Sequence, residues 1–189
     1  IVGAMTPDER AVILPAALTR TLKRSVPFAI ELANVPTRQQ EQILWALIAA
    51  LPRFAGGAID ATGPGQTIAE YTADKFGSAR IHQVLLSRKW YAEWMQKFVE
   101  SFQDATIELP RDKSLEDDIR AIEEIDGIPM VPAIETKDIK DPELFRHGDG
   151  AIAGALMWFA SLHRGAPIEG EEAPPRASRW DAVAGDDDN

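Results

Sequence analysis

Two aspartates stand at positions where acidic side chains often do chemistry. Asp60 ends a short apolar segment, and a turn with Gly63 and Gly65 follows it. Asp149 lies in the sequence RHGDGA, at the start of the last predicted helix. Carboxylate oxygens are the ligands that hard cations such as Mg²⁺ and Mn²⁺ prefer. If that helix packs across the end of the strand, the two acids form two halves of a divalent-cation site.

Each aspartate also has a structural interpretation. Asp60 can satisfy the backbone amides of the turn that follows it. Asp149 is favoured at a helix start by the helix dipole alone. The glycine turn is a weak phosphate-loop signal, because it lacks the spacing and the lysine of a P-loop. The combination of an acid at a strand end and an acid in the first turn of a terminal helix is what favours chemistry here.

The composition narrows the class of protein. The chain has 189 residues and no cysteine, which excludes thiol catalysis, thiolate zinc sites and disulfides. This length supports one hydrophobic core of ordinary size. No apolar run approaches the roughly 20 residues of a membrane span, and the opening IVGAMTPDER lacks a signal-peptide pattern. The sequence therefore predicts an intracellular protein without a membrane partner.

The net charge of −10 is unevenly spread. Residues 1–164 carry a net charge of −5, and the short segment 165–189 carries another −5. That segment is rich in proline, glycine and acid, so we expect one domain over 1–164 and a flexible acidic tail over 165–189. A mildly acidic domain must meet a polyanion through local basic patches or bound cations.

The hydrophobic patterns predict an α/β fold. Two strands come first, and helices then alternate with further strands, which is typical of a mixed sheet covered on both faces. We expect strands at 11–18, 27–35, 58–60 and 80–87, shorter extended pieces at 106–110 and 128–136, and helices at 38–54, 67–76, 89–103, 114–125 and 149–163.

Aromatic residues recur at every fourth position of the predicted helix 89–103. Such a stripe is typical of a helix face in a core, although aromatic rows also stack on nucleic-acid bases. We assign these residues, and two further tryptophans, to packing: Trp90, Trp94, Phe98, Phe102, Trp45 and Trp158.

Three separate segments carry a resemblance to a known family. They are ELANVPTRQQEQILWALIAALPRFAGGAIDATGPGQTIAEYTADKFG, ATIELPRD and RHGDGAIAGALM, in that order along the chain. Together they resemble the C-terminal nuclease domain of the terminase large subunit of Mu-like phages and prophages, over roughly residues 8–163. The resemblance implies an RNase H-like fold of the RuvC type.

The same resemblance implies a function. It implies a metal-dependent DNA endonuclease that cuts concatemeric double-stranded DNA during genome packaging, by two-metal phosphodiester hydrolysis with Mg²⁺ or Mn²⁺. The implied partners are the terminase ATPase domain, the small terminase and the portal. The implied location is the cytoplasm of the bacterial host.

The resemblance also assigns residues. Asp60 resembles the acid that ends the fourth strand, and Asp149 resembles the acid of the final helix. Asp8, or Glu9, resembles the acid of the first hairpin. The family's first-strand aspartate would fall at or just before Ile1 to Gly3, where this chain has none. We expect a truncated start; the alternatives are that Asp8 substitutes for it or that the site is incomplete.

Other residues are weaker candidates. His147 is a candidate for positioning water or moving a proton, against the alternative of a solvated histidine at a helix start. Five basic residues are candidates for DNA-backbone contacts, with surface solvation as the equal alternative: Arg20, Lys23, Arg24, Arg88 and Lys89.

Two alternative functions stay open. The first is a catalytically incomplete RNase H-like module that docks DNA or a packaging partner, which the absent first-strand aspartate favours. The second is a resolvase-type nuclease of the same fold, which only a preference for branched DNA would separate from a terminase nuclease.

Overall fold

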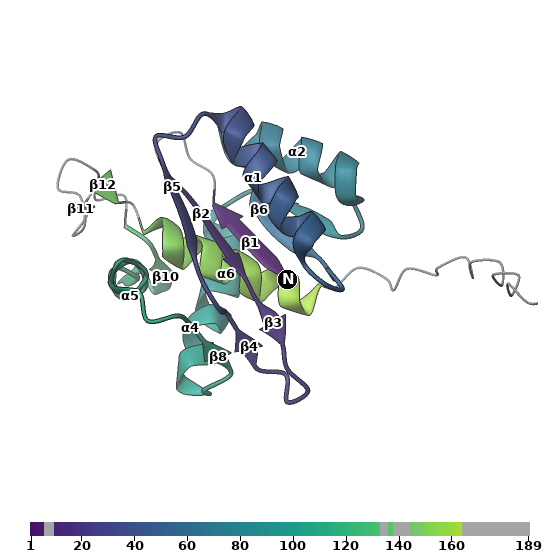
Figure 1. Ribbon diagram of the computed structural model, residues 1–189. Helices are drawn as coiled ribbons and strands as arrows, with labels where there is room; N and C mark the ends of the chain where they lie inside the picture. The colour runs from purple at the N-terminus through teal and green to yellow at the C-terminus, as the bar shows by residue number, and fades with distance from the viewer. Residues whose placement is uncertain (6–9, 133–135, 138–144, 147, 164–189) are drawn as a thin grey trace, which may run out of the picture.

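The computed structural model describes residues 1–5, 10–132, 136–137, 145–146 and 148–163. A five-stranded mixed sheet forms the centre of the fold, with helices on both of its faces (Figure 1). The predicted α/β class with a mixed sheet is confirmed. The predicted tail, 165–189, lies outside the described residues.

The central sheet has the strand order β5-β2-β1-β6-β7. Its strands are β1 (Val2–Met5), β2 (Arg10–Pro15), β5 (Ile30–Ala33), β6 (Gly57–Asp60) and β7 (Ile81–Val84). The strands β1, β6 and β7 are parallel, while β2 is antiparallel to both β1 and β5. The carboxyl ends of the three parallel strands therefore meet at one edge of the sheet.

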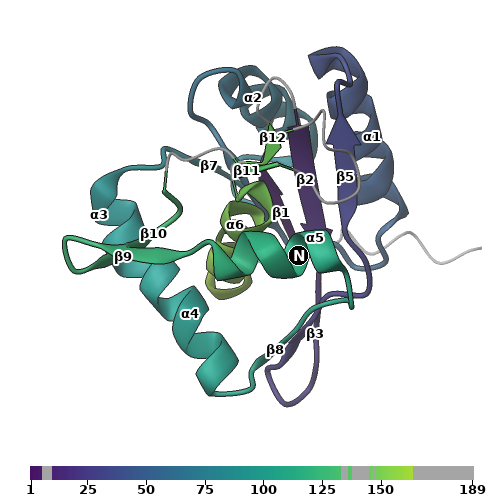
Figure 2. The ribbon, with the colours of Figure 1, turned by 90° about the vertical axis from the view of Figure 1, so that its left-hand side faces the viewer.

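Different helices cover the two faces of the sheet. The structure has α1 (Thr37–Ala50), α2 (Gly65–Phe76), α3 (Arg88–Trp90), α4 (Gln96–Gln103), α5 (Lys113–Arg120) and α6 (Asp149–Leu162), with a π-helical turn η1 (Tyr91–Met95) between α3 and α4. Figures 1 and 2 show α1 and α2 on one face of the sheet and α6 along the other.

Shorter strands lie outside the central sheet. The strands β3 (Ala17–Leu18), β4 (Arg24–Ser25) and β8 (Ile107–Glu108) form one small sheet. Two further pairs are β9 (Glu123–Ile125) with β10 (Ile128–Met130), and β11 (Thr136–Lys137) with β12 (Phe145–Arg146). No helix of the described residues is long and apolar enough to cross a membrane.

The period of two along β1 divides the core into two clusters. Val2 and Ala4 pack in the cluster that faces α1 and α2, together with Ile59. Gly3 instead lies against α6, where an added Cβ would come within 2.2 Å of the Ala153 carbonyl oxygen. Because Gly3 has no side chain, the backbone of α6 can rest directly on the central strand.

Besides shifts in the ends of elements, the predicted elements differ in type from the structure in three places. The strand β1 was not expected, because four residues that include glycine and alanine give no period. The predicted helix 114–125 ends at Arg120, and 123–130 form the hairpin β9–β10. Its turn residues Asp126 and Gly127 have φ of 50° and 77°, the geometry that an Asp-Gly hairpin signal indicates. The predicted helix 89–103 is interrupted by η1.

Candidate active site

Asp60 is the last residue of β6 and is only 3% exposed. Its Oδ1 accepts a hydrogen bond of 2.9 Å from the backbone N–H of Thr62, so the turn does use this carboxylate. Thr62 Oγ1 in turn accepts a 3.2 Å bond from the N–H of Leu86, which ties the turn to the segment after β7. Burial raises the pKa of the Asp60 carboxyl, and the hydrogen bonds from Thr62 oppose that rise.

Asp149 is the first residue of α6 and is 1% exposed. Gly148 before it has φ of 69°, in the left-handed region, and an added Cβ there would come within 2.4 Å of Val131. Only glycine meets both conditions without strain. The turn into α6, and with it the position of Asp149, therefore depends on Gly148.

The direction of α6 brings the two aspartates to the same end of the fold. His82, near the start of β7, contacts the other end of the helix through a 2.6 Å bond between its Nε2 and the His163 carbonyl oxygen. The helix thus runs opposite to β1, β6 and β7. Its first residue, Asp149, lies at the sheet edge where β6 ends in Asp60.

Tyr91, the first residue of η1, lies close enough to both carboxylates for their charges to act on its phenol. Burial, the charge of Asp60 and the charge of Asp149 together raise the pKa of Tyr91 to about 12. The charges of both carboxylates act on the same phenol, so all three groups lie in one region of the structure. Sequence reasoning treated this helix as packing and missed Tyr91; π-helical turns, which often mark functional sites, have no clear sequence signal.

Tyr91 offers a direct test of this geometry. The chain has two tyrosines, so Tyr71→Phe leaves Tyr91 as the only one. In that background, absorbance titration is expected to give a pKa of about 12. Adding Asp60→Asn and Asp149→Asn is expected to lower this pKa, because only the effect of burial then remains. An unchanged pKa would show that the carboxylates lie too far from the phenol to form one site.

Asp118 on α5 holds the start of α6 in place. Its Oδ2 accepts a 2.9 Å hydrogen bond from the backbone N–H of Gly150, the residue after Asp149. Asp118 is 3% exposed, and Figure 2 shows α5 crossing beside the first turn of α6. A helix start has backbone N–H groups without helical partners, and a carboxylate satisfies them well. Asp118 is thus a positioning residue that sequence reasoning missed.

Asp118→Ala is expected to destabilise the protein by about 1–2 kcal/mol, because it removes a buried helix cap. The matched control is Asp117→Ala on the same helix. Asp117 forms a surface ion pair with Lys113, and such a pair contributes at most about 1 kcal/mol. Urea unfolding of both variants measures the difference, and equal stabilities would contradict the capping role.

The basic residues of the β3–β4 hairpin lie far from this edge. The hairpin follows the end of β2 that pairs with the start of β1, so Arg20 and Lys23 are at the opposite end of the sheet (Figure 1). Lys23 is ion-paired with Glu108. Arg24 is 7% exposed, bonds to Ser161, and stacks 3.8 Å from the centre of the Trp158 ring. The guanidinium of Arg24 is therefore buried and is not available for the DNA contact considered for this residue.

Arg88 and Lys89 lie closer to the aspartates. Both begin α3, just after the end of β7, and Val84 of that strand pairs with Asp60. Both side chains are exposed, and Arg88 forms a 2.7 Å ion pair with Asp126. The two predicted basic groups therefore occupy opposite ends of the sheet, and only this one adjoins the acidic edge.

Three other predicted site residues fall outside the described part of the chain. These are Asp8, Glu9 and His147, and their roles stay predictions. The strand residues on either side of the first two, Met5 and Arg10, end β1 and begin β2.

The donor set at the acidic edge fits one hard divalent cation. Asp60 and Asp149 supply two carboxylates, and Mg²⁺ is commonly bound by one or two carboxylates together with water and substrate phosphate. No group of three His, Cys, Asp or Glu side chains suited to a metal occurs among the described residues. Within those residues, the donors are fewer than a pair of cations requires.

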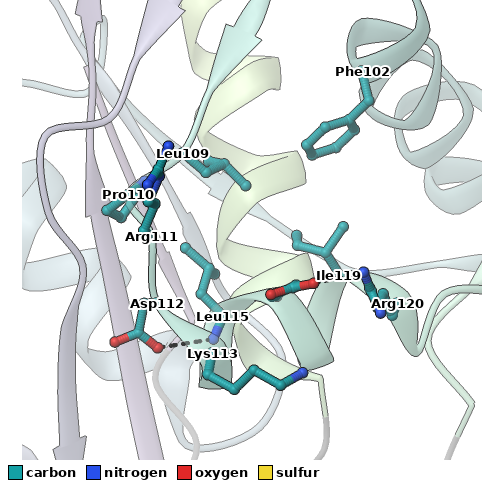
Figure 3. A pocket seen from close by; sticks show the side chains of 10 residues that line it. Phe102, Leu109, Pro110, Arg111, Asp112, Lys113, Leu115, Ile119 and Arg120 are labelled. Carbon is teal, nitrogen blue, oxygen red and sulfur yellow. Dashed lines mark hydrogen bonds and ion pairs between the residues drawn. The ribbon is translucent and has the colours of Figure 1, made fainter.

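A separate hollow of about 660 Å³ lies between β8, α4 and α5. Figure 3 shows apolar side chains around it, with the basic side chains of Arg111 and Lys113 at its border. Asp112 beside it is the N-cap of α5 and accepts 2.9 and 3.1 Å bonds from the N–H groups of Ser114 and Leu115. Neither Asp60 nor Asp149 lines this hollow, so it is separate from the candidate active site.

Known proteins resemble this chain in both sequence and fold. No family model matches the sequence. The Mu-like prophage FluMu protein gp28 of Haemophilus influenzae is 35% identical over 155 residues, which cover 82% of this chain and 30% of that protein. The probable terminase, large subunit gp28 of Escherichia phage Mu is 37% identical over 178 residues, which cover 93% of this chain and 32% of that protein.

The chain thus spans about a third of the length of these curated relatives. Among solved structures, the large terminase nuclease from thermophilic phage G20c matches with a TM-score of 0.55 and 14% identity, over 84% of this chain and 80% of that one. The chain is therefore homologous to one segment of the gp28 terminase large subunit of Mu-like phages and prophages, and its fold is the RNase H-like fold of a large terminase nuclease.

Proposed function

We propose that this chain is the nuclease domain of a phage terminase large subunit and that it cuts concatemeric double-stranded DNA during genome packaging. In this proposal it acts in the cytoplasm of the bacterial host, with the terminase ATPase domain, the small terminase and the portal as partners. The homology to gp28 and the terminase nuclease fold support this assignment. The observation that carries it is that Asp60, at the end of β6, and Asp149, at the start of α6, lie at the same edge of the sheet although they are 89 positions apart.

Asp60 and Asp149 are the residues that would hold a divalent cation, Mg²⁺ or Mn²⁺. A bound cation would supply charge stabilisation for the phosphate oxygens and a lower pKa for an attacking water. The two carboxylates would bind and orient this cation. Without a cation, their negative charges repel a phosphate group. The protein without metal is therefore expected to bind DNA weakly.

Other residues around the edge have separate roles in this proposal. Asp118 fixes the start of α6 and so the place of Asp149. The phenol of Tyr91 is protonated at neutral pH and offers an O–H donor near the carboxylates. Arg88 and Lys89, which are exposed near this edge, would contact the DNA backbone. Asp8 stays a predicted third metal ligand, and Glu9 and His147 stay predicted accessory residues.

A noncatalytic docking module is the second candidate. It is favoured by the absence of a third metal-binding group among the described residues. Such a module would bind DNA or a packaging partner without cutting. Its DNA binding would rest on exposed basic side chains and would not require Asp60 or Asp149.

The test is incubation of this chain with supercoiled plasmid in the presence of Mn²⁺, Mg²⁺ or EDTA. The nuclease proposal predicts nicked and linear products with a divalent cation and intact plasmid with EDTA. A parallel reaction with a four-way DNA junction separates the resolvase alternative, which predicts faster cutting of the junction. Binding without cutting in any metal would contradict the nuclease proposal and favour the docking module.

A further inference from the structure

The end of β1 lies beside Asp60. The two strands pair in parallel, with Val2 opposite Gly57 and Ala4 opposite Ile59. The paired residues end there, and one further step in the same register would set Met5, the last residue of β1, opposite Asp60, the last residue of β6. Neighbouring strands are about 4.8 Å apart, so these two backbone positions are immediate neighbours.

Position 5 also belongs to the α6 face of the sheet. Residues two apart in a strand share a face. Gly3 lies against α6, and position 5 is two residues further along the same strand. Ala58 packs in the cluster that contains the α6 residues, and Asp60 is two residues beyond it. Since α6 begins with Asp149 at this edge, three backbone positions converge there: 5, 60 and 149.

The residue type at position 5 does not suit the cation that the other two acids would bind. Methionine offers only a thioether, a soft ligand that hard cations such as Mg²⁺ and Mn²⁺ bind poorly. The affinity of an oxygen-ligand site rises with the number of charged ligands. The described residues supply two carboxylates and no third group within metal-binding reach.

We propose that position 5 of β1 is a further ligand position of the cation site, and that methionine there leaves the site with a lower cation affinity than a carboxylate at that position would give. The inference rests on the proposed cation binding by Asp60 and Asp149. It places the first-strand ligand position inside the chain, at Met5, instead of at or before Ile1 to Gly3. A carboxylate at position 5 then completes the site.

The experiment compares Met5→Asp with the wild type and with Met5→Asn, a matched control of the same shape without the charge. Free Mn²⁺ is measured by electron paramagnetic resonance during a titration, and thermal unfolding is followed with and without Mn²⁺. Met5→Asp is expected to bind Mn²⁺ at least about tenfold more tightly than the wild type, because a charged oxygen ligand is added. Met5→Asn is expected to bind no more tightly than the wild type.

The stability readout covers the case in which Met5→Asp folds poorly without metal. A second carboxylate beside Asp60 adds repulsion, so its midpoint of unfolding without metal is expected to fall below that of Met5→Asn. Mn²⁺ is expected to raise that midpoint more for Met5→Asp than for either other protein, since a cation that binds the folded state stabilises it. Failure of saturating Mn²⁺ to fold or stabilise Met5→Asp would overturn the inference.

The outcomes separate this inference from the proposed function. If the wild type nicks plasmid but Met5→Asp binds Mn²⁺ no more tightly, the inference fails and the nuclease proposal stands. If no protein nicks plasmid but Met5→Asp gains Mn²⁺ affinity, the ligand position stands and the nuclease proposal fails. Equal gains in Met5→Asp and Met5→Asn would also overturn the inference, because the charge would then be irrelevant.

Discussion

Asp60→Asn and Asp149→Asn are each expected to reduce metal-dependent nicking of supercoiled plasmid by at least about 100-fold, more than the loss of a residue that only supports a metal ligand. Each change removes one of the two charges that would hold the cation while keeping the shape of the side chain. Asp60→Asn also keeps an oxygen that can accept the bond from Thr62. Initial rates of nicking, measured in Mn²⁺ and in Mg²⁺, check this prediction.

The control for these variants is their free energy of unfolding, measured in EDTA. Burial raises the folded-state pKa of Asp60 above its ordinary value of 3.8, so the folded state binds more protons than the unfolded state between these two values. The free energy of unfolding therefore falls as pH rises through this window and stays reduced at neutral pH. Asp60→Asn is expected to be more stable than the wild type at pH 7, and this advantage should disappear at pH values below 3.8.

The combination of lost cutting and gained stability is diagnostic of a functional acid. A purely structural Asp60, kept for its bond to Thr62, would give the opposite pair of results, with cutting retained and stability lowered. Chemical unfolding at several pH values in EDTA, alongside the nicking assay, distinguishes the two. Exposed Asp104→Asn, at the end of α4, is a control expected to change neither property.

Gly3→Ala is expected to destabilise the protein by about 3 kcal/mol, at the upper end of what overpacking usually costs. An added Cβ would come within 2.2 Å of the Ala153 carbonyl oxygen and 2.4 Å of the Met157 backbone nitrogen. Both atoms belong to the backbone of α6, so the clash cannot be relieved by a side-chain rotation. The helix must move away from the sheet, and Asp149 must move with it.

Gly57→Ala on the neighbouring strand is the matched control. Its added Cβ would meet the Val2 carbonyl oxygen at 3.0 Å, a contact that a small shift relieves. We expect a much smaller loss of stability for Gly57→Ala than for Gly3→Ala in urea unfolding. Similar losses in the two variants would contradict the close contact of α6 with β1.

The sequence predicted the elements that carry a strong local signal. The helix that begins at Asp149 and the strand that ends at Asp60 are both found, because an apolar helical run and a strand followed by glycines have clear patterns. These two acids were expected to meet if the terminal helix packs across the end of the strand. The direction of α6, fixed by His82 and His163, is consistent with that packing.

The parts that the sequence did not predict depend on contacts between distant segments. The sequence near Asp118 gives no sign of its role, because it is one of several acids on a short polar helix. Its role comes from its hydrogen bond with the backbone N–H of Gly150, which is distant in the sequence. The place of Tyr91 near both aspartates likewise depends on how its helix packs against distant segments. The strand β1 was missed because it is short and is held in place by its pairing with the distant strand β6. Arg24 was expected to be an exposed basic residue, because the Trp158 ring that it packs against is 134 positions away in the sequence.

Titration of Mn²⁺ against the wild type, Asp60→Asn and Asp149→Asn tests the central claim most directly, since it requires neither DNA nor turnover. The claim is that two acids from distant segments form one cation site. It predicts saturable binding by the wild type and a loss of at least about tenfold in affinity in each variant, because each removes a charged ligand. Equal Mn²⁺ affinity in all three proteins would show that Asp60 and Asp149 do not form a shared cation site.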